Sequence, residues 1–376
     1  MFFSPITERS FKVRTLYISI YIALILGGLT MVIPFIIMLS GSVETTSRFT
    51  DSKFFPKYFF SDRAYYQRYI EAKYGGILDN YRMAASEAYA NFTSLEIPKS
   101  DPEQLLLWQE FLADPNQTKA SPQLAATGFT RPSNRLPAYN THKFRYWLTS
   151  QFDKNIRSLN NALNTQFIVP TTINGPILNI FGAATTKTPL LEKFYQFSTE
   201  EVPDTQKFFW DAGGYYRSVF LPRILGPIEN FNALYSTSFS SYKEIPFSST
   251  LPDLAAEQWT VYVKTLLRPN FIELTEAGQA RMNEEKLGKE TFIRSSAKPE
   301  ELVVRTYDRI FAEWAEQKHG VKDARIPQQQ LDLKAAMNES FFWKWQFVSL
   351  NYYTVFDEIF LYGRAVLNTL ILVVLS

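Results

Sequence analysis

Residues Leu16–Leu39 read LYISIYIALILGGLTMVIPFIIML, and no charged residue occurs anywhere in residues 15–43. As an α-helix, these 24 residues would be roughly 36 Å long. About 20 apolar residues are enough to cross the hydrocarbon core of a bilayer. A secretory signal peptide has a shorter apolar run, of about 7–15 residues, followed by a small-residue cleavage site that Met38–Ser42 does not resemble. We therefore expect a transmembrane helix over residues 15–40, with a kink at Pro34.

The charges around this span predict its orientation. Arg9, Lys12 and Arg14 precede it within a short tail. The positive-inside rule then places residues 1–14 in the cytoplasm and residues 45–360 outside it, at the cell inner membrane. Three basic residues also follow the span, but a long domain is translocated largely regardless of its charge.

The C-terminal stretch is apolar as well. After Arg364 the chain reads AVLNTLILVVLS, which as a helix spans roughly 18 Å of a hydrocarbon core about 30 Å thick. We interpret residues 364–376 as the start of a second transmembrane helix, and expect the sequence to be the N-terminal part of a longer membrane protein. A buried C-terminal helix is the alternative.

Composition excludes several classes of function. The 376 residues carry 39 basic and 37 acidic side chains, a net charge of +2, which argues against a nucleic-acid-binding protein. With no cysteine, the chain has no disulfide, thiolate zinc site or cysteine nucleophile. Its two histidines, His142 and His319, lie far apart among polar residues, and we expect both at the surface.

No motif for catalysis, cofactor binding or metal binding is present, so we predict none of these sites and no cofactor. Gly213-Gly214 is expected to be a turn, because no nucleotide-binding pattern surrounds it. Adjacent carboxylates on a helix point in different directions. We therefore expect the three Glu-Glu pairs to lie on solvated helix faces: Glu200-Glu201, Glu284-Glu285 and Glu300-Glu301.

The middle of the chain, residues 45–360, is predicted to be a large and mainly helical domain. A capping-box pattern begins at Ser100 and precedes an amphipathic helix that ends at Asp114-Pro115. Pro252–Leu267 also reads as helix, and another is expected from Pro299 to a C-cap at Gly320. Residues 166–173 are the best strand candidate.

Three passages in this domain resemble one another, near residues 66–98, 146–173 and 216–246. An aromatic-rich stretch leads in each to an isoleucine, and each closes on a second one; the two sets are Ile77, Ile156 and Ile228, and Ile97, Ile173 and Ile245. The later two passages share Asn160 with Asn232, and Phe167 with Phe239. We predict duplicated helix–loop–helix units with the first isoleucines equivalently buried, and a degenerate fourth copy from Ile310. Chance similarity in an aromatic-rich helical chain is the alternative.

The two ends together resemble permease subunits of carbohydrate ABC importers of the maltose type. The N-terminal span carries a Pro-Phe pair and a Met-Leu-Ser-x-Ser exit at Pro34-Phe35 and Met38–Ser42. The tail carries an Asn-Tyr-x-x-Val-Phe segment and a Leu-Asn-Thr-Leu-Ile start of the next helix, at Asn351–Phe356 and Leu367–Ile371. Such permeases join these helices by a short loop, whereas here about 300 residues intervene.

This resemblance implies a carbohydrate transporter subunit that is not itself an enzyme. Its implied partners are a second permease subunit, an ATP-binding subunit, an extracytoplasmic solute-binding protein and membrane lipid. The cytoplasmic loop that couples to the ATP-binding subunit lies beyond this sequence in the family, so no coupling residue carries over. The echoed passages also resemble a helical scaffold segment of β-galactosidase-like glycoside hydrolases. Three other classes stay open: a polysaccharide chain-length regulator, an extracytoplasmic sensor module and a membrane-anchored glycosidase.

The chain contains 32 Phe, 21 Tyr and 7 Trp, which have several possible uses. Most are expected to pack between helices. Exposed Tyr and Trp would stack on sugar rings or contact the binding protein, and Phe341–Phe347 precedes the second apolar segment closely enough to form an interfacial belt. We expect residues 60–340 to fold independently and to bind a glycan or the binding protein.

Overall fold

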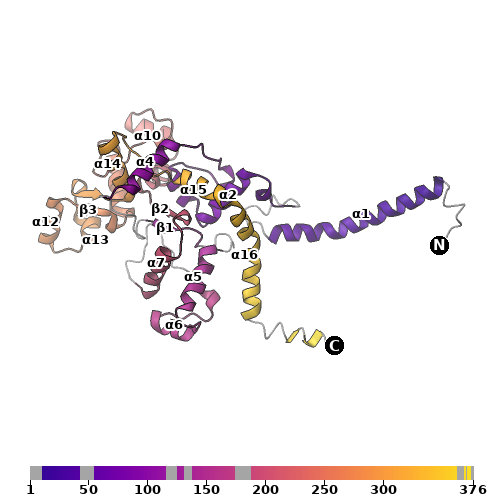
Figure 1. Cartoon of the computed structure of the whole chain (residues 1–376). Helices are drawn as coiled ribbons and strands as arrows, with labels where there is room; N and C mark the ends of the chain where they lie inside the picture. The colour runs from indigo at the N-terminus through magenta and orange to yellow at the C-terminus, as the bar shows by residue number, and fades with distance from the viewer. Residues whose placement is uncertain are drawn as a thin grey trace.

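The computed structural model describes residues 11–42, 55–115, 125–130, 138–173, 188–361, 368–369 and 371–373. Glu8, which is expected in the cytoplasm, lies outside the described residues. Most of the second apolar segment, residues 364–376, also lies outside them. Figure 1 shows a helical body from which one long helix, α1, projects, while the C-terminal helix α16 runs along the same side of the body.

The chain is mainly helical, as the sequence predicted. The α-helices of the first half are α1 (Phe11–Ser42), α2 (Asp62–Lys73), α3 (Leu78–Ala85), α4 (Pro102–Ala113), α5 (Tyr139–Ser150), α6 (Ile156–Leu163) and α7 (Pro189–Glu200). Those of the second half are α8 (Ala212–Tyr215), α9 (Leu221–Leu225), α10 (Ile228–Tyr235), α11 (Ala256–Val261), α12 (Glu276–Glu285), α13 (Lys289–Thr291), α14 (Tyr307–His319), α15 (Gln328–Asn338) and α16 (Ser340–Leu361).

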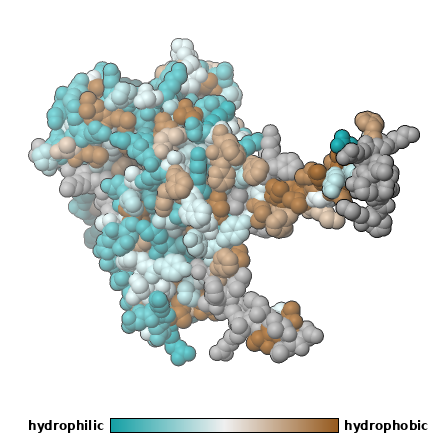
Figure 2. Space-filling view, turned by 45° about the vertical axis from the view of Figure 1, so that its right-hand side comes forward, coloured by the Kyte–Doolittle hydropathy of each residue, from teal (hydrophilic) through white to brown (hydrophobic). Residues whose placement is uncertain are grey.

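Helix α1 is one continuous helix of 32 residues, and Pro34 lies inside it. Among the described residues it is the one helix long and apolar enough to cross a membrane, over Arg14–Ser42, and none of its apolar window is buried against the protein. Most of its apolar side chains are exposed, and on the face seen in Figure 2 the projecting rod is largely brown. A helix with no polar face, whose apolar stretch is not covered by protein, is suited to an apolar solvent.

Two small antiparallel sheets supplement the helices. Strand β1 (Ala125–Thr127) pairs with β2 (Lys207–Phe209), and β3 (Ile272–Leu274) pairs with β4 (Leu302–Val304). The strand expected at residues 166–173 is wrong. The backbone amide and carbonyl of Phe167 are both hydrogen-bonded to the Asn160 side chain, and residues Pro170–Thr172 form a 3-10 turn. These backbone groups therefore do not pair with a neighbouring strand.

The duplicated units are present with a shifted register. Helices α3, α6 and α10 each have eight residues and end at a residue in the left-handed conformation: Ser86, Asn164 and Ser236. A 3-10 turn follows each helix, at Phe92–Ser94, Pro170–Thr172 and Tyr242–Glu244. The next residue is then a buried aliphatic one, Leu95, Ile173 or Ile245.

This alignment pairs Leu78, not Ile77, with Ile156 and Ile228, and all of these side chains are half-buried. Leu95 closes the first unit in place of Ile97, which is 38% exposed. The fourth copy is wrong, because Ile310 lies inside the 13-residue helix α14 rather than at the start of a short one.

A second and shorter duplication escaped the sequence analysis. The first copy consists of a π-helical turn at Tyr262–Leu266, a 3-10 turn that begins with Pro269, and strand β3. The same three elements recur 30 residues later (292 − 262 = 30), as the π-helical turn Phe292–Ser296, the 3-10 turn that begins with Pro299, and strand β4. The two copies pair through β3 and β4. The helix predicted from Pro299 therefore begins only at Tyr307, although it ends at Gly320 in the left-handed conformation, as expected.

The predicted helix after Ser100 is confirmed, with a different cap. Asp101 rather than Ser100 is the N-cap, and its carboxylate accepts a hydrogen bond from the Gln104 amide at 3.0 Å. The helix, α4, packs against α14 in a small aromatic core, where Trp108 and Phe311 meet edge to face with ring centroids 4.9 Å apart.

Gly213 and Gly214 lie in helix α8 rather than in a turn, which corrects the sequence prediction. A Cβ atom on Gly214 would lie 2.1 Å from the carbonyl oxygen of Met83, in α3. Glycine is needed here because two helices approach at backbone distance, not because the chain reverses.

Tyrosines of α2 and α3 form much of the main core, and several of their hydroxyl groups are hydrogen-bonded within it. Tyr65 donates to the carbonyl of Ala336 at 2.8 Å, and Tyr74 donates to Asp332 at 2.6 Å. Asp332 also accepts from the buried ammonium group of Lys73 at 2.7 Å. These bonds satisfy the hydroxyl groups of Tyr65 and Tyr74, whereas the hydroxyl of Tyr69, also in α2, is buried without a hydrogen-bond partner among the described residues.

Candidate functional site

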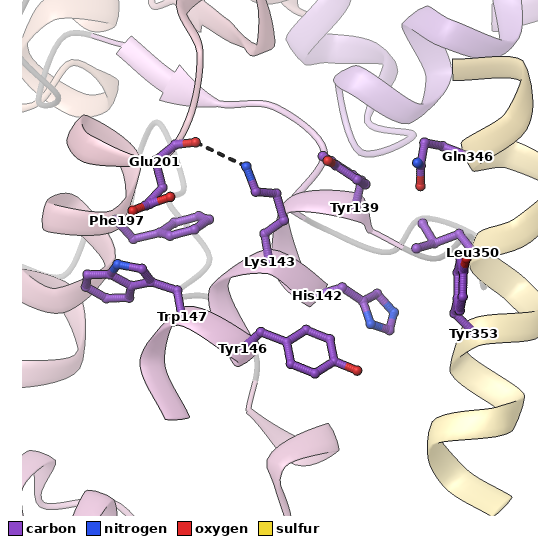
Figure 3. A pocket seen from close by; sticks show the side chains of 10 residues that line it. All are labelled: Tyr139, His142, Lys143, Tyr146, Trp147, Phe197, Glu201, Gln346, Leu350 and Tyr353. Carbon is purple, nitrogen blue, oxygen red and sulfur yellow. Dashed lines mark hydrogen bonds between the residues drawn. The ribbon is translucent and has the colours of Figure 1, made fainter. Parts of the chain in front are cut away.

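The strongest candidate site is a cleft of about 420 Å³ between helix α5, the end of α7 and helix α16. This volume lies within the range of about 300–1,000 Å³ that is typical of small-molecule sites. Its lining, shown in Figure 3, consists of Tyr139, His142, Lys143, Tyr146, Trp147, Phe197, Glu201, Gln346, Leu350 and Tyr353.

Helix α5 supplies half of the lining from a single face. Its contributions are spaced at i, i+3, i+4, i+7 and i+8: Tyr139, His142, Lys143, Tyr146 and Trp147. Residues with this spacing share one side of a helix. Phe144 and Leu148 lie on the other side and are fully buried in a core shared with α6 and α7. The core thus orients the aromatic face toward the cleft.

The wall formed by α7 is tied to α5 through a lysine and two rings. The Lys143 ammonium group donates a hydrogen bond to the backbone carbonyl of Glu201 at 3.2 Å, the dashed line in Figure 3. A cation at this position also complements the negative end of the helix dipole. The rings of Trp147 and Phe197 lie 5.7 Å apart, and the Lys193 ammonium group lies 5.9 Å from the centroid of Trp147.

Helix α16 forms the opposite wall with Gln346, Leu350 and Tyr353. It is anchored to the body by Trp343, whose ring stacks on Phe129 with centroids 3.9 Å apart. Tyr139 contacts the Trp343 ring at 5.4 Å and so joins the two walls. Burial, with a smaller contribution from the Glu339 carboxylate, raises the pKa of Tyr139.

The groups in this cleft are suited to a small molecule that has both an apolar face and polar edges. Aromatic faces dominate the lining, and an imidazole, an ammonium, a carboxylate and an amide lie among them. Within the described residues, no group of three or more His, Asp or Glu side chains is placed to hold a metal ion. An aromatic face attracts the weakly positive C–H bonds of an apolar ring surface, and polar groups at its edge can bond hydroxyls. A sugar ring combines these two features.

The residues considered in the sequence analysis lie in varied places. His142 is half-buried in the cleft, and His319 lies at the end of α14, 3.3 Å from a Glu110 carboxylate oxygen. Glu301 is buried and binds Arg281 at 2.7 Å, so the expectation of a solvated face is wrong for this residue. The aromatic stripe of α5 was visible as YxxHKxxYW from Tyr139, but the opposite wall comes from a helix about 200 residues away.

A second feature joins helices α1 and α16. The hydroxyl groups of Ser42 and Tyr352 are hydrogen-bonded at 2.7 Å, and the Asn351 amide donates to the Ser42 carbonyl at 2.6 Å. Ser42 is the last residue of α1, and the other two lie in α16. The helical body therefore begins and ends at one place.

A third feature is a buried cluster of charges around the start of α8. Both oxygens of Asp308 accept hydrogen bonds from the amides of Ala212 and Gly213, at 3.3 and 3.2 Å, and Asp211 accepts from Gly214 at 2.5 Å. Arg217 is buried nearby, 3.6 Å from Asp323. Burial, reinforced by Asp308, raises the pKa of Asp211 to about 7.

Comparisons of this chain with protein families, with curated proteins and with solved structures find no match.

Proposed function

We propose that this chain belongs to the membrane-spanning permease subunit of a carbohydrate ABC importer. In this proposal α1 is the first transmembrane helix, residues 45–360 are an extracytoplasmic insertion, and the cleft between α5 and α16 receives the sugar. The partners would be a second permease subunit, an ATP-binding subunit and a solute-binding protein, with ATP hydrolysis on the separate subunit.

The observation that carries this proposal is the meeting of Ser42 with Asn351 and Tyr352. These three residues belong to the two segments that resemble the permeases, although about 310 positions separate them. An insertion in a short loop must begin and end at nearby points, because the two helices that it separates stay neighbours. The geometry supports an insertion of this kind, and the aromatic cleft supports a carbohydrate as ligand.

Transport is tested in the native host with the gene deleted. We expect loss of growth on one carbohydrate of a panel of sole carbon sources, and recovery when the wild-type gene is restored. If the deletion strain grows normally on every carbohydrate of the panel and the length distribution of its surface polysaccharide is altered, the result would favour the chain-length regulator and reject transport.

The cleft is tested separately on the full chain in lipid nanodiscs, by calorimetry with malto-, cello- and xylo-oligosaccharides. Trp147→Ala should abolish any measured binding, whereas Trp147→Phe should retain part of it because the flat ring and its contact with Phe197 remain. Leu234→Ala, at an exposed side chain of α10, is the control and should bind as wild type. Equal affinities for all four proteins would exclude this cleft as the sugar site.

A further inference from the structure

Helix α16 is apolar on two opposite sides. One side packs on the body through Trp343, Phe347 and Leu350, which are 1%, 8% and 8% exposed. The other side carries a second apolar stripe with helical spacing: Phe341, Trp345, Val348, Tyr352, Val355 and Phe356. Within this stripe Phe341 is 85% exposed and Trp345 is 57% exposed. A surface helix normally has one apolar side, so the second side needs an apolar neighbour.

More exposed aromatic side chains lie on the turn next to α16. The 3-10 turn η3 (Lys57–Phe59) packs against α16 through Tyr58, whose ring lies 5.9 Å from that of Phe347. Around it, Phe55 is 63% exposed and Phe60 is 79% exposed. A large aromatic side chain offers about 150–250 Å² of surface. The stripe itself exposes four, Phe341, Trp345, Tyr352 and Phe356, so it reaches the few hundred Å² that mark an interaction surface.

The position of α1 indicates what covers this surface. Tyr352, within the stripe, is hydrogen-bonded to Ser42, the last residue of the apolar helix. In Figure 1, α16 lies along the side of the body from which α1 departs, and the two helices run in clearly different directions. If α1 crosses a bilayer, its end lies at the bilayer surface, and the stripe of α16 lies at the same level.

The chemistry of the stripe fits that location. Trp and Tyr are enriched at the headgroup level of membranes, because their rings are apolar and each carries one polar group. The first turn of α16 contains no acidic residue that anionic lipid would repel. A helix in the interface plane buries its apolar side at the boundary between headgroups and acyl chains.

We propose that the stripe of α16, with Phe55 and Phe60 of the neighbouring turn, rests in the interface of the bilayer that α1 crosses, so that α16 lies along the membrane surface. The stripe holds the body against the membrane with the cleft of α5 and α16 close to the lipid. This inference depends on α1 being in a membrane, and it is independent of what the protein transports.

The absence of cysteine from the chain permits a direct test. Phe341→Cys, Trp345→Cys and Phe60→Cys are each labelled with an environment-sensitive NBD fluorophore in the full chain, reconstituted into phosphatidylcholine–phosphatidylglycerol nanodiscs. Leu29→Cys marks the middle of α1, and Leu106→Cys on α4, 58% exposed, marks the water-facing body. We expect blue-shifted emission and several-fold stronger quenching by doxyl-labelled lipid at positions 341, 345 and 60 than at 106.

Each other result overturns the proposal in a distinguishable way. Water-like emission at positions 341 and 345 with a lipid-quenched probe at 29 would show that α1 is in the membrane without α16. Blue-shifted emission without lipid quenching would show that protein covers the stripe. A water-like signal at 29 as well would reject membrane insertion of α1, and with it the permease assignment.

Discussion

The carboxamide of Asn232 is hydrogen-bonded to both backbone groups of Phe239, accepting from the amide at 3.0 Å and donating to the carbonyl at 2.8 Å. Asn160 makes the same pair of bonds to Phe167, at 2.9 and 2.8 Å. In the first unit Arg82 takes this position and donates to the carbonyl of Tyr89 at 2.7 Å. One side chain thus closes the loop after the eight-residue helix in every unit.

Removing this side chain should destabilise the unit. Asn232→Ala and Asn160→Ala each leave two backbone groups without their partner, and we expect a loss of about 2–3 kcal/mol in the free energy of unfolding, measured by urea denaturation. Asn232→Asp, which accepts but does not donate, should lose less. Asn161→Ala, on the exposed side of α6, is the matched control. Equal stability of Asn160→Ala and Asn161→Ala would contradict the role of the bonds.

The close contact of α8 with α3 predicts a sharp difference between two glycines. Gly214→Ala would place its Cβ 2.1 Å from the Met83 carbonyl oxygen, so the helices must separate, and we expect a loss of about 3 kcal/mol or more. Gly288→Ala meets no atom within 4 Å and should be neutral. Melting temperatures of the two variants test this, and similar values for both would show that the helices do not approach so closely.

The buried pair of Lys73 and Asp332 should couple strongly. Their charged atoms lie 2.7 Å apart with side chains 1% and 0% exposed. Lys73→Met leaves a buried carboxylate without its cation and should cost about 3–5 kcal/mol. Lys207→Met removes a cation from the exposed Asp204 and should cost less than about 1 kcal/mol. In a double-mutant cycle, Lys73→Met with Asp332→Asn should cost less than the sum of the single changes, and strict additivity would argue against the pair.

The raised pKa of Asp211 predicts a dependence of stability on pH. The folded protein keeps the proton up to about pH 7, whereas the unfolded chain loses it near the ordinary value of 3.8. The folded state binds more protons between these values, so its stability falls as pH rises from about 4 to 7, by an amount on the order of 4 kcal/mol. Asp211→Asn should remove this slope. The free energy of unfolding of both proteins is measured by urea titration at several pH values. If it changes with pH in the same way for both, the raised pKa of Asp211 is refuted.

Membrane topology can be tested with single cysteines. Asp204, in the body, has a side chain that is 98% exposed, and Asp204→Cys should react with an impermeant thiol reagent in intact spheroplasts. Glu8→Cys should react only after lysis, because the basic cluster before Leu16 retains the N-terminus in the cytoplasm. The reverse pattern of labelling would invert the orientation.

The sequence alone determined the features that depend on local patterns. The apolar run of α1, the helix from Pro102 and the cap at Gly320 were predictable, because hydrophobic periodicity and capping chemistry act over a few residues. The repeat was also visible, since Asn160 and Asn232 make their contacts only seven residues away. Its register was misplaced by one residue in the first unit, where Arg82 replaces the asparagine that marks the others.

Only the tertiary structure decided which distant segments meet. Gly214 packs on Met83, Tyr352 bonds Ser42, and α16 closes a cleft with α5, in each case between residues more than 100 positions apart. Such contacts result from how whole helices bury their apolar faces together, and no local pattern encodes the partner of a given face. For the same reason, the sequence predicted aromatic side chains in Phe341–Phe347 but could not tell Trp343, buried in the body, from Trp345, which is exposed on the opposite side of the same helix.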